Sequence, residues 1–361
     1  MRDVTGTELP GSPTSLFDHA MRLHRESPDA PLERSGDPYP DESWHGRGDT
    51  PRRPKDRRTV GLDLAALLDA HFADPASTPA DLADACHQVH VPLFRTEHVV
   101  AAARRVEIER VRRTGRWLVR RGTDRCAVTI GLALLETAPE GGDIPLLQTI
   151  GLLSEGFGPL VVDTMARCRG ALSGLLWLGD RVEGWGRVTV VEKLCAAYGV
   201  HARDWLLRRS CNGEYHNQYF AAEVAIAADL ASVITGDDPD LDLVHHTGVL
   251  LSAMTDCAGM GLTLDEYPAA PNVLAAHSKH VARLAPTTHR YGNLANLADY
   301  LLRPSTREWR GREQAIDRYL TLLNQPEWEA TARTGLARGD FRVLWLRQAV
   351  GARLDLAPFT S

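Results

Sequence analysis

The chain has 361 residues, of which 43% are hydrophobic and 24% are charged, and its formal net charge is −6. A chain of this length can bury one large core or two ordinary ones, and its negative charge excludes a bulk electrostatic attraction to nucleic acid or to an anionic membrane. Only three of the 41 basic residues are lysines, an arginine bias typical of GC-rich bacterial genomes, so arginine clusters carry less weight here.

The six cysteines lie tens of residues apart and form no C-x-x-C motif. This spacing predicts buried free thiols in a reducing cytoplasm. No apolar run approaches the ~18 residues that a membrane span needs, and the polar amino terminus has no signal-peptide core. We therefore expect a cytoplasmic protein without a membrane contact.

Residues 1–59 are rich in Pro, Gly, Ser, Asp and Arg and show almost no apolar periodicity. Such a segment cannot bury enough surface to offset the entropy of ordering it. We therefore expect residues 1–59 to be a disordered tail that is dispensable for folding, with one short helix over LFDHAMRLH (16–24). A helical domain over residues 60–361 should follow. The basic run over 52–58 is expected to be solvated, although it could contact an anionic partner.

The pattern beyond the tail is helical almost throughout. The starts of three helices are marked by a capping residue or a proline, at Thr78–Pro79, at Asp238–Pro239 and at Pro326. Apolar residues recur at helical spacing over 220–234, 273–284 and 316–323. Strand-like alternation occurs only in RCAVTIGLALL (125–135), which suits a buried helix equally well. The sequence therefore predicts an all-α protein without βαβ units.

Two tryptophans mark a repeated pattern in the middle of the chain. Trp177 and Trp205 are 28 residues apart, and a leucine one position later and an arginine four positions later keep the same offset. In each copy a short helix should meet a break, at Gly184 or at Asn212, before a longer helix begins. This order of elements is the pattern of an α-solenoid, in which neighbouring helix pairs stack to form one core. The tryptophans would fill the seam between successive pairs.

The segment ALSGLLWLGDRVEGWGRVTVVEKLCAAYGVHARDWLLRRSCNGEYHNQYFAAEVA (171–225) resembles the HEAT-like repeat family, and residues 239–303 resemble it more loosely. The resemblance covers roughly residues 140–303 and rests on a pattern, since this family has no fixed motif. It implies antiparallel helix pairs stacked in a curved superhelix. Because the family consists mostly of scaffolds and partner-binding proteins, it implies a partner but no chemistry.

An arginine stripe over RRVEIERVRRTGRWLVRRGTDR (104–125) is the strongest local charge feature, with nine arginines against three acidic residues. On a helix, Arg105, Arg112, Arg116 and Arg120 would line up near one face, with Trp117 close by. The stripe could grip phosphate or an acidic protein, or it could be a solvated face.

A polar cluster, SCNGEYHNQYF (210–220), stands at the break before a predicted long helix. Its side chains could contact a partner at the rim of a solenoid's concave face, or Asn212 could simply cap a helix. Trp185, between two glycines, could bind a ligand or belong to the repeat. Taken together, the candidate partner-binding residues are Arg105, Arg112, Arg116, Arg120, Trp185, Asn212, Glu214, Tyr215 and His216.

Histidines and cysteines cluster at three places, namely Cys86 with His87, His90 and His98; His245 with His246; and His277 with His280. No carboxylate stands at a fixed spacing from any of them and no H-E-x-x-H motif occurs, so we expect no metal. His277 lies on an apolar stripe, which is typical of a core histidine. Because no phosphate loop, dinucleotide fingerprint or nucleophile motif occurs either, we expect no cofactor.

Two functions from different classes are consistent with these features. The first is a non-enzymatic scaffold or regulator that binds a protein along a concave helical face. The alternative is a HEAT-like nucleic-acid-binding protein or a DNA-repair glycosylase-type enzyme, for which Trp117, Trp177, Trp185 and the arginine stripe would supply contacts. Such glycosylases resemble this chain only in part, because the position one helical turn after Trp185 is Thr189 and not an aspartate. The protein-binding hypothesis is therefore preferred.

Overall fold

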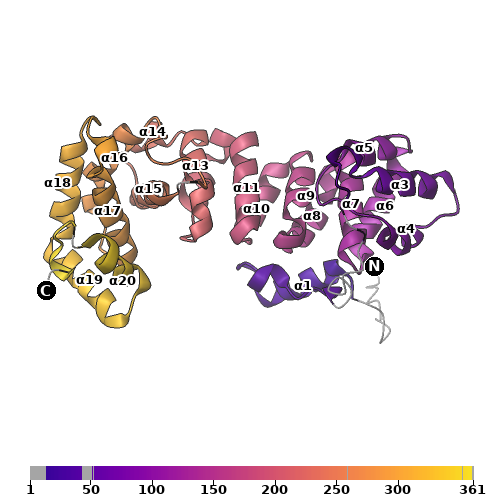
Figure 1. The fold of residues 1–361 in the computed structure, drawn as a ribbon, viewed down its shortest axis with the longest axis horizontal. Coiled ribbons are helices and arrows are strands. Elements are labelled where there is room, and N and C mark those ends of the chain that lie inside the picture. The colour runs from indigo at the N-terminus through magenta and orange to yellow at the C-terminus, as the bar shows by residue number, and fades with distance from the viewer. Residues whose placement is uncertain (1–13, 43–50, 52, 258, 352, 360–361) are drawn as a thin grey trace, which may run out of the picture. The chain divides into compact units, whose positions relative to one another are not determined.

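The computed structural model describes residues 14–42, 51, 53–257, 259–351 and 353–359. Every regular element in these residues is a helix and none is a strand, so the all-α class expected from the sequence is confirmed (Figure 1). The chain divides into two compact units, residues 1–193 and 194–361. In the part of the chain that the structure describes, no helix is both long enough and apolar enough to cross a bilayer.

The helix start predicted at Thr78–Pro79 in the first unit is confirmed. Thr78 caps α4 in a reciprocal capping box with Asp81, and Pro79 is the first residue of this helix. Asp124 caps α7 by accepting the Ala127 N–H at 2.9 Å. The α-helices of this unit are α1 (Leu16–Glu26), α3 (Leu62–Ala73), α4 (Pro79–Ala85), α5 (Glu97–Arg104), α6 (Ile108–Arg121), α7 (Arg125–Thr137), α8 (Ile144–Gly151), α9 (Ser154–Ala166) and α10 (Ala171–Gly179), and α11 (Gly184–Ala197) crosses the division between the units.

The ambiguous segment 125–135 is a helix, α7, and it forms the centre of the first unit's core. Its apolar residues are buried on both faces, so the apolar positions show no helical stripe in the sequence. Two glycines let α6 and α7 approach closely: a Cβ added to Gly115 would lie 3.1 Å from the carbonyl oxygen of Gly131.

Residues 14–42 differ from the disordered tail that their composition suggests. The short predicted helix exists as α1, which packs against α6 and α8 and buries Leu16 and Phe17. The Leu16 N–H donates to the carbonyl oxygen of Gly122 at 3.0 Å, and the ring of His24 meets Trp177 edge to face with centroids 5.5 Å apart. These contacts supply the burial that the segment cannot provide for itself. The remainder of the predicted tail lies partly outside the described residues.

The second unit consists of α-helices joined by short 3₁₀ turns. Packing between α15 and α17, and between α18 and both α16 and α17, forms its core, while α20 packs on α17. Its helices are α12 (Arg203–Arg209), α13 (Ala221–Ala227), α14 (Leu230–Ile234), α15 (Leu241–Ala253), α16 (Ala270–His280), α17 (Thr288–Leu301), α18 (Arg312–Leu323), α19 (Pro326–Arg338) and α20 (Phe341–Leu346), which continues into a π-helical turn, η10 (Arg347–Gly351).

The two tryptophans of the repeated pattern lie in unlike surroundings. Trp205 on α12 is buried, whereas Trp177 on α10 is half-buried beside α1. The long helix expected after the second tryptophan is divided into a 3₁₀ turn, η6 (Tyr215–Tyr219), then α13 and α14. Asp229, in a left-handed conformation at φ 51°, stands between α13 and α14. Gly186 is required where it stands, since a Cβ there would lie 2.3 Å from the Ser154 Oγ. The stacked solenoid stays a prediction.

Candidate partner-binding cleft

A cleft of about 690 Å³ lies within the second unit. Four segments that are far apart in the sequence form its walls: the loop and turn around η6, the C-terminal end of α15 with η7 (Met254–Asp256), one face of α17, and α20 with η10. This volume falls within the range of pockets that bind small molecules or the side chains of a peptide.

Hydrogen bonds within the sequence cluster 210–220 hold the first wall in place. The buried Asn217 side chain accepts the backbone N–H groups of Asn212 at 2.9 Å and Gly213 at 3.0 Å, and it donates to the Asn212 Oδ1 at 2.9 Å. Gly213 takes φ +89°, which favours glycine. These bonds stop the helix that periodicity predicts here and present Glu214 and Tyr215 to the cleft.

Three large apolar side chains are exposed around the cleft. Tyr215 is 57% exposed, Phe341 79% and Trp345 42%. The Tyr215 ring is braced by His216, with centroids 4.6 Å apart, and by Tyr219, with centroids 6.2 Å apart. Single exposed apolar residues need no explanation, but several that border one concavity are typical of a binding surface.

The wall formed by α17 is polar and follows helical spacing. His289, Asn293, Asn296 and Asp299 all line the cleft. The Asn296 Nδ2 donates to the Ser252 Oγ at 3.4 Å, whereas its buried Oδ1 has no hydrogen-bond partner among the described residues. A buried amide oxygen without a partner costs free energy, which a donor brought by a ligand or a water would recover.

An ion pair and two further arginines set the charge of the cleft. Asp299 binds the guanidinium of Arg353 through two hydrogen bonds of 2.8 Å each. Arg342 and Arg303 also line the cleft, and neither forms an ion pair with any residue that the structure describes. The guanidinium of Arg303 lies 4.4 Å from the centre of the Tyr300 ring, and its Nη1 donates to the Thr255 carbonyl oxygen at 3.5 Å. The Arg342 Nη2 reaches the loop opposite, to within 3.5 Å of where a Cβ on Gly213 would lie.

His289, which lines the cleft, and its neighbour His245 add no positive charge at neutral pH. Burial lowers the pKa of His289, and Arg342 lowers it further. The ring of His289 lies 5.8 Å from that of His245, whose pKa is lowered to about 4 by burial and then by His246. The positive charge of the cleft therefore comes from its arginines, beside the carboxylates of Glu214, Asp256 and Asp299.

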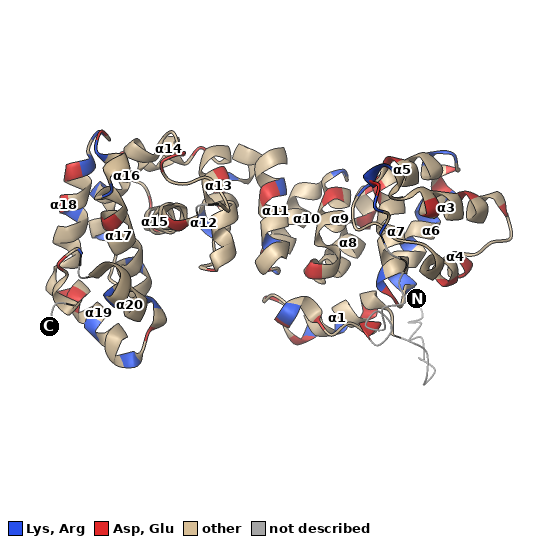
Figure 2. Cartoon of the chain, viewed as in Figure 1, with Lys and Arg blue, Asp and Glu red and all other residues tan. Residues whose placement is uncertain are grey.

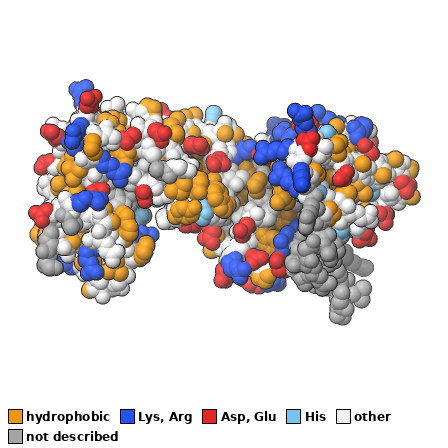
Figure 3. Space-filling view, viewed as in Figure 1, with side chains coloured by type: hydrophobic (Ala, Val, Ile, Leu, Met, Phe, Trp, Pro, Cys, Tyr) orange, Lys and Arg blue, Asp and Glu red, His pale blue; other side chains and the backbone are white. Residues whose placement is uncertain are grey.

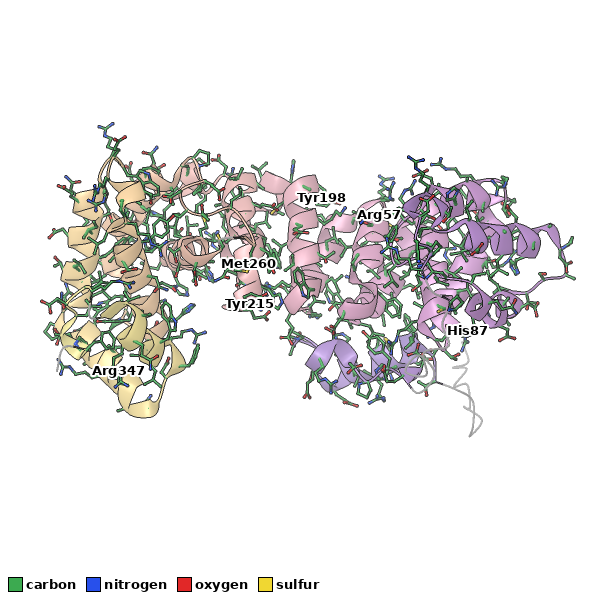
Figure 4. All side chains as sticks on the ribbon, viewed as in Figure 1. Arg57, His87, Tyr198, Tyr215, Met260 and Arg347 are labelled. Carbon is green, nitrogen blue, oxygen red and sulfur yellow. The ribbon has the colours of Figure 1, made fainter. Side chains whose placement is uncertain are left out.

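The structure places the predicted contact residues in two groups. Glu214 and Tyr215 line the cleft, while Asn212 and His216 support them from the same loop. Trp185, on α11, is 54% exposed and belongs to the first unit, as do the four arginines of the stripe. Figure 4 labels Tyr215 in the cleft-lining loop.

Carboxylates and an aromatic ring engage the four arginines, Arg105, Arg112, Arg116 and Arg120, that the sequence placed near one face of the stripe 104–125. Arg105 forms a bidentate pair with Asp69, Arg112 pairs with Glu109 at 2.5 Å, and Arg116 binds Glu140 and the buried Asp143. Arg120 makes a different contact: its guanidinium lies 3.9 Å from the centre of the Phe17 ring. Figure 2 shows acidic and basic residues interspersed along the helices of this unit. The role of the stripe as a phosphate site stays a prediction without support from these contacts.

The sequence reasoning missed the α17 and α20 walls. The polar residues Asn293, Asn296 and Asp299 recur at steps of three inside RYGNLANLADY, and this pattern could have marked a polar helix face. Phe341 and Trp345 are one helical turn apart and gave no comparable signal, because apolar residues at that spacing usually enter a core.

Comparisons with protein-family models, with curated proteins and with solved structures found no match to this chain. The HEAT-like resemblance therefore stays a prediction, and functional reasoning depends on the cleft itself.

Proposed function

We propose that this protein is a non-enzymatic scaffold or regulator, and that the cleft of the second unit binds a segment of a protein partner. The observation that carries the proposal is the arrangement of Tyr215, Phe341 and Trp345, which are exposed around a cleft of about 690 Å³ with a carboxamide-lined wall. Exposed aromatic rings beside a pocket are the anchors that most often dominate protein interfaces.

The chemistry of the walls specifies the kind of segment. The aromatic rings suit an apolar or aromatic side chain, and the amides of Asn293, Asn296 and Gln218 can pair with the backbone N–H and C=O groups of an extended peptide. Arg303 and Arg342 offer planar guanidinium groups to an acidic side chain. We therefore propose a segment that combines an apolar anchor with an Asp or Glu.

Mixed charge favours a protein over a nucleic acid as the partner. A nucleic-acid site needs a surface that is positive along its length, whereas the cleft holds both acidic and basic residues. Figure 3 shows apolar side chains and both charges interspersed on the visible surface of each unit. In this proposal, stacked antiparallel helix pairs of HEAT-like type form the scaffold that presents the cleft.

The proposal can be tested by screening a displayed library of random linear peptides for binding to the whole chain. We expect enrichment of peptides that contain an aromatic or large aliphatic residue near an Asp or Glu. Trp345→Ala should weaken their binding by about 30-fold, the loss typical of a central aromatic anchor. Arg342→Glu should also weaken peptide binding by about 10-fold, because the introduced carboxylate would repel the Asp or Glu of the peptide.

Two matched variants control for general effects on the surface. Ile226→Ala removes an exposed apolar side chain of α13 that lies outside the cleft, and Arg347→Glu reverses a charge on η10 that does not line it (labelled in Figure 4). Both should leave peptide binding unchanged. The proposal fails if no peptide is enriched, or if the selected peptides bind the Trp345→Ala and Arg342→Glu variants as well as the parent.

A further inference from the structure

A cluster of metal-ligating side chains lies in the first unit, far in sequence from the cleft residues. Cys86 and His87 stand directly after α4, in the 3₁₀ turn η3 (Cys86–Gln88), and Asp124 caps the start of α7. One ligand atom from each of the three lies within 4.8 Å of the other two. Figure 4 labels His87, which lies beside the helices of this unit.

The spacing of these atoms is close to that of a tetrahedral site. The Cys86 Sγ lies 3.9 Å from the Asp124 Oδ1, and the His87 Nε2 lies 3.7 Å from the Asp124 Oδ2. Zinc bonds of about 2.0–2.3 Å place neighbouring ligand atoms roughly 3.3–3.8 Å apart. Each of these two contacts with Asp124 needs to close by well under about 1 Å to reach that spacing. The ligand atoms of Cys86 and His87 lie within 4.8 Å of each other.

The capping role of Asp124 leaves it able to bind an ion. Its Oδ1 accepts the Ala127 N–H at 2.9 Å, while its Oδ2 faces His87. Cys86 and Asp124 are buried, whereas the His87 side chain is 23% exposed and gives access from solvent. A buried thiol, imidazole and carboxylate that converge from two helices are what a zinc site requires.

A fourth donor comes from the same turn as Asp124. Cys126 stands two residues later in the motif D-x-C. It is outside the group of three residues whose ligand atoms all lie within 4.8 Å of one another. We propose that Cys86, His87 and Asp124 bind one zinc-class divalent ion, which ties the end of α4 to the start of α7, and that Cys126 turns in to become the fourth ligand. Two thiolates, an imidazole and a carboxylate form a closed ligand set, and this indicates a structural ion and not a catalytic one.

Titration of the whole chain with Co²⁺, after treatment with a chelator and a reductant, tests the proposal. One equivalent should bind and produce the intense absorption of thiolate-to-cobalt charge transfer, and Zn²⁺ should displace it. Cys86→Ser, Cys126→Ser and Asp124→Asn should each weaken binding by about 10-fold or more. Asparagine keeps the oxygen that caps α7, so this variant removes the ligand charge without removing the cap.

Two variants serve as matched controls. Cys168→Ser changes another buried thiol, which donates to the Thr164 carbonyl, and His90→Gln changes a histidine that lies outside the cluster in the same segment. Both should bind Co²⁺ as the parent does, and circular dichroism should show that every variant is folded.

Three results would overturn the proposal. The first is that the parent binds no Co²⁺ or produces no thiolate absorption, a result that needs no variant to fold. The second is that binding survives Cys86→Ser or Asp124→Asn. The third is that Cys86 and Cys126 are found joined as a disulfide in protein purified without reductant, with metal binding absent after reduction.

Discussion

Lowering the pH should destabilise the second unit through His277. This residue lies on α16 with its ring fully buried, and its Nδ1 is 2.8 Å from the Oη of Tyr319 on α18. On the other side of the ring, a Cβ added to Gly248 of α15 would lie 3.0 Å from the Nε2. Burial lowers the pKa of His277 to about 3, a hydrogen bond to the backbone of Val244 raises it slightly, and His245 and His280 lower it again.

The sign and size of the effect follow from proton linkage. The pKa of the histidine is 6.5 in the unfolded chain and about 3 in the folded one, so the unfolded chain binds more protons between these values. The free energy of unfolding is therefore unaffected above pH 6.5 and falls as the pH drops toward 3. At pH 5 the difference is about 1.5 pH units at about 1.36 kcal/mol each, which gives a loss of about 2 kcal/mol.

Urea unfolding followed by far-ultraviolet circular dichroism at pH 8 and pH 5 measures this loss. His277→Gln should be less stable than the parent at pH 8, and the gap between the two proteins should shrink by about 2 kcal/mol at pH 5. His201→Gln, which replaces an exposed ring of the same unit, controls for the removal of a histidine. A gap that stays constant between the two pH values would refute the reasoning.

Three further predictions concern the first unit. A chain that begins at Thr14 should be as stable as the parent. A chain that begins at Pro51 should lose roughly 3–6 kcal/mol in free energy of unfolding, because it lacks the buried Leu16 and Phe17 of α1. Equal stability of the two truncated chains in urea would show that α1 does not pack against the rest of the first unit. Arg116→Glu should lower the free energy of unfolding by about 3–5 kcal/mol, since it leaves the buried carboxylate of Asp143 without its 2.6 Å partner. The control, Arg113→Glu, changes an exposed position without an ion pair among the described residues and should alter the free energy of unfolding by under about 0.5 kcal/mol. The parent and the Arg116→Glu variant should both bind a short DNA duplex only weakly at physiological salt. Sub-micromolar affinity of the parent that Arg116→Glu abolishes would instead support the nucleic-acid alternative.

Local chemistry made the helices of this protein predictable. The Thr78–Pro79 pair starts α4, and Pro326 starts α19. The prediction at Asp238 was two residues early, because Asp240 accepts the Leu243 N–H and caps α15 instead. Caps and prolines act within one helical turn, so the sequence displays them directly.

Contacts beyond one helical turn explain why the predictions for residues 214–230 and 14–42 differ from the structure. The expected helix through 214–230 is interrupted by the side chain of Asn217, which satisfies backbone groups four and five residues earlier. Residues 14–42 were assigned to a disordered tail because their composition offers little apolar surface. They are ordered because α6, α8 and Trp177 provide the other half of the contact, and no local pattern reveals a partner more than 100 residues away.

The same limit applies to the two candidate sites. Glu214 and Tyr215 were found because their polar cluster interrupts an apolar pattern, but the walls that face them come from α17 and α20. Cys86 and His87 are neighbours in the sequence, but their spacing predicts no metal because the carboxylate, Asp124, is 38 residues from Cys86. A ligand set drawn from two helices is visible only when the helices are placed together.

The arginines of the stripe and those of the cleft differ in their ion pairing, and this difference affects which partner the protein can bind. In the stripe 104–125, Arg105, Arg112 and Arg116 are matched by carboxylates, so they stabilise the fold and offer little to a ligand. In the cleft, Arg303 and Arg342 have no such match among the described residues. The net charge of −6 predicts no attraction to an acidic partner at long range, but a carboxylate that enters the cleft meets two guanidinium groups at close range. Affinity for an acidic segment would then be set after contact, by how slowly the complex dissociates and not by how quickly it forms.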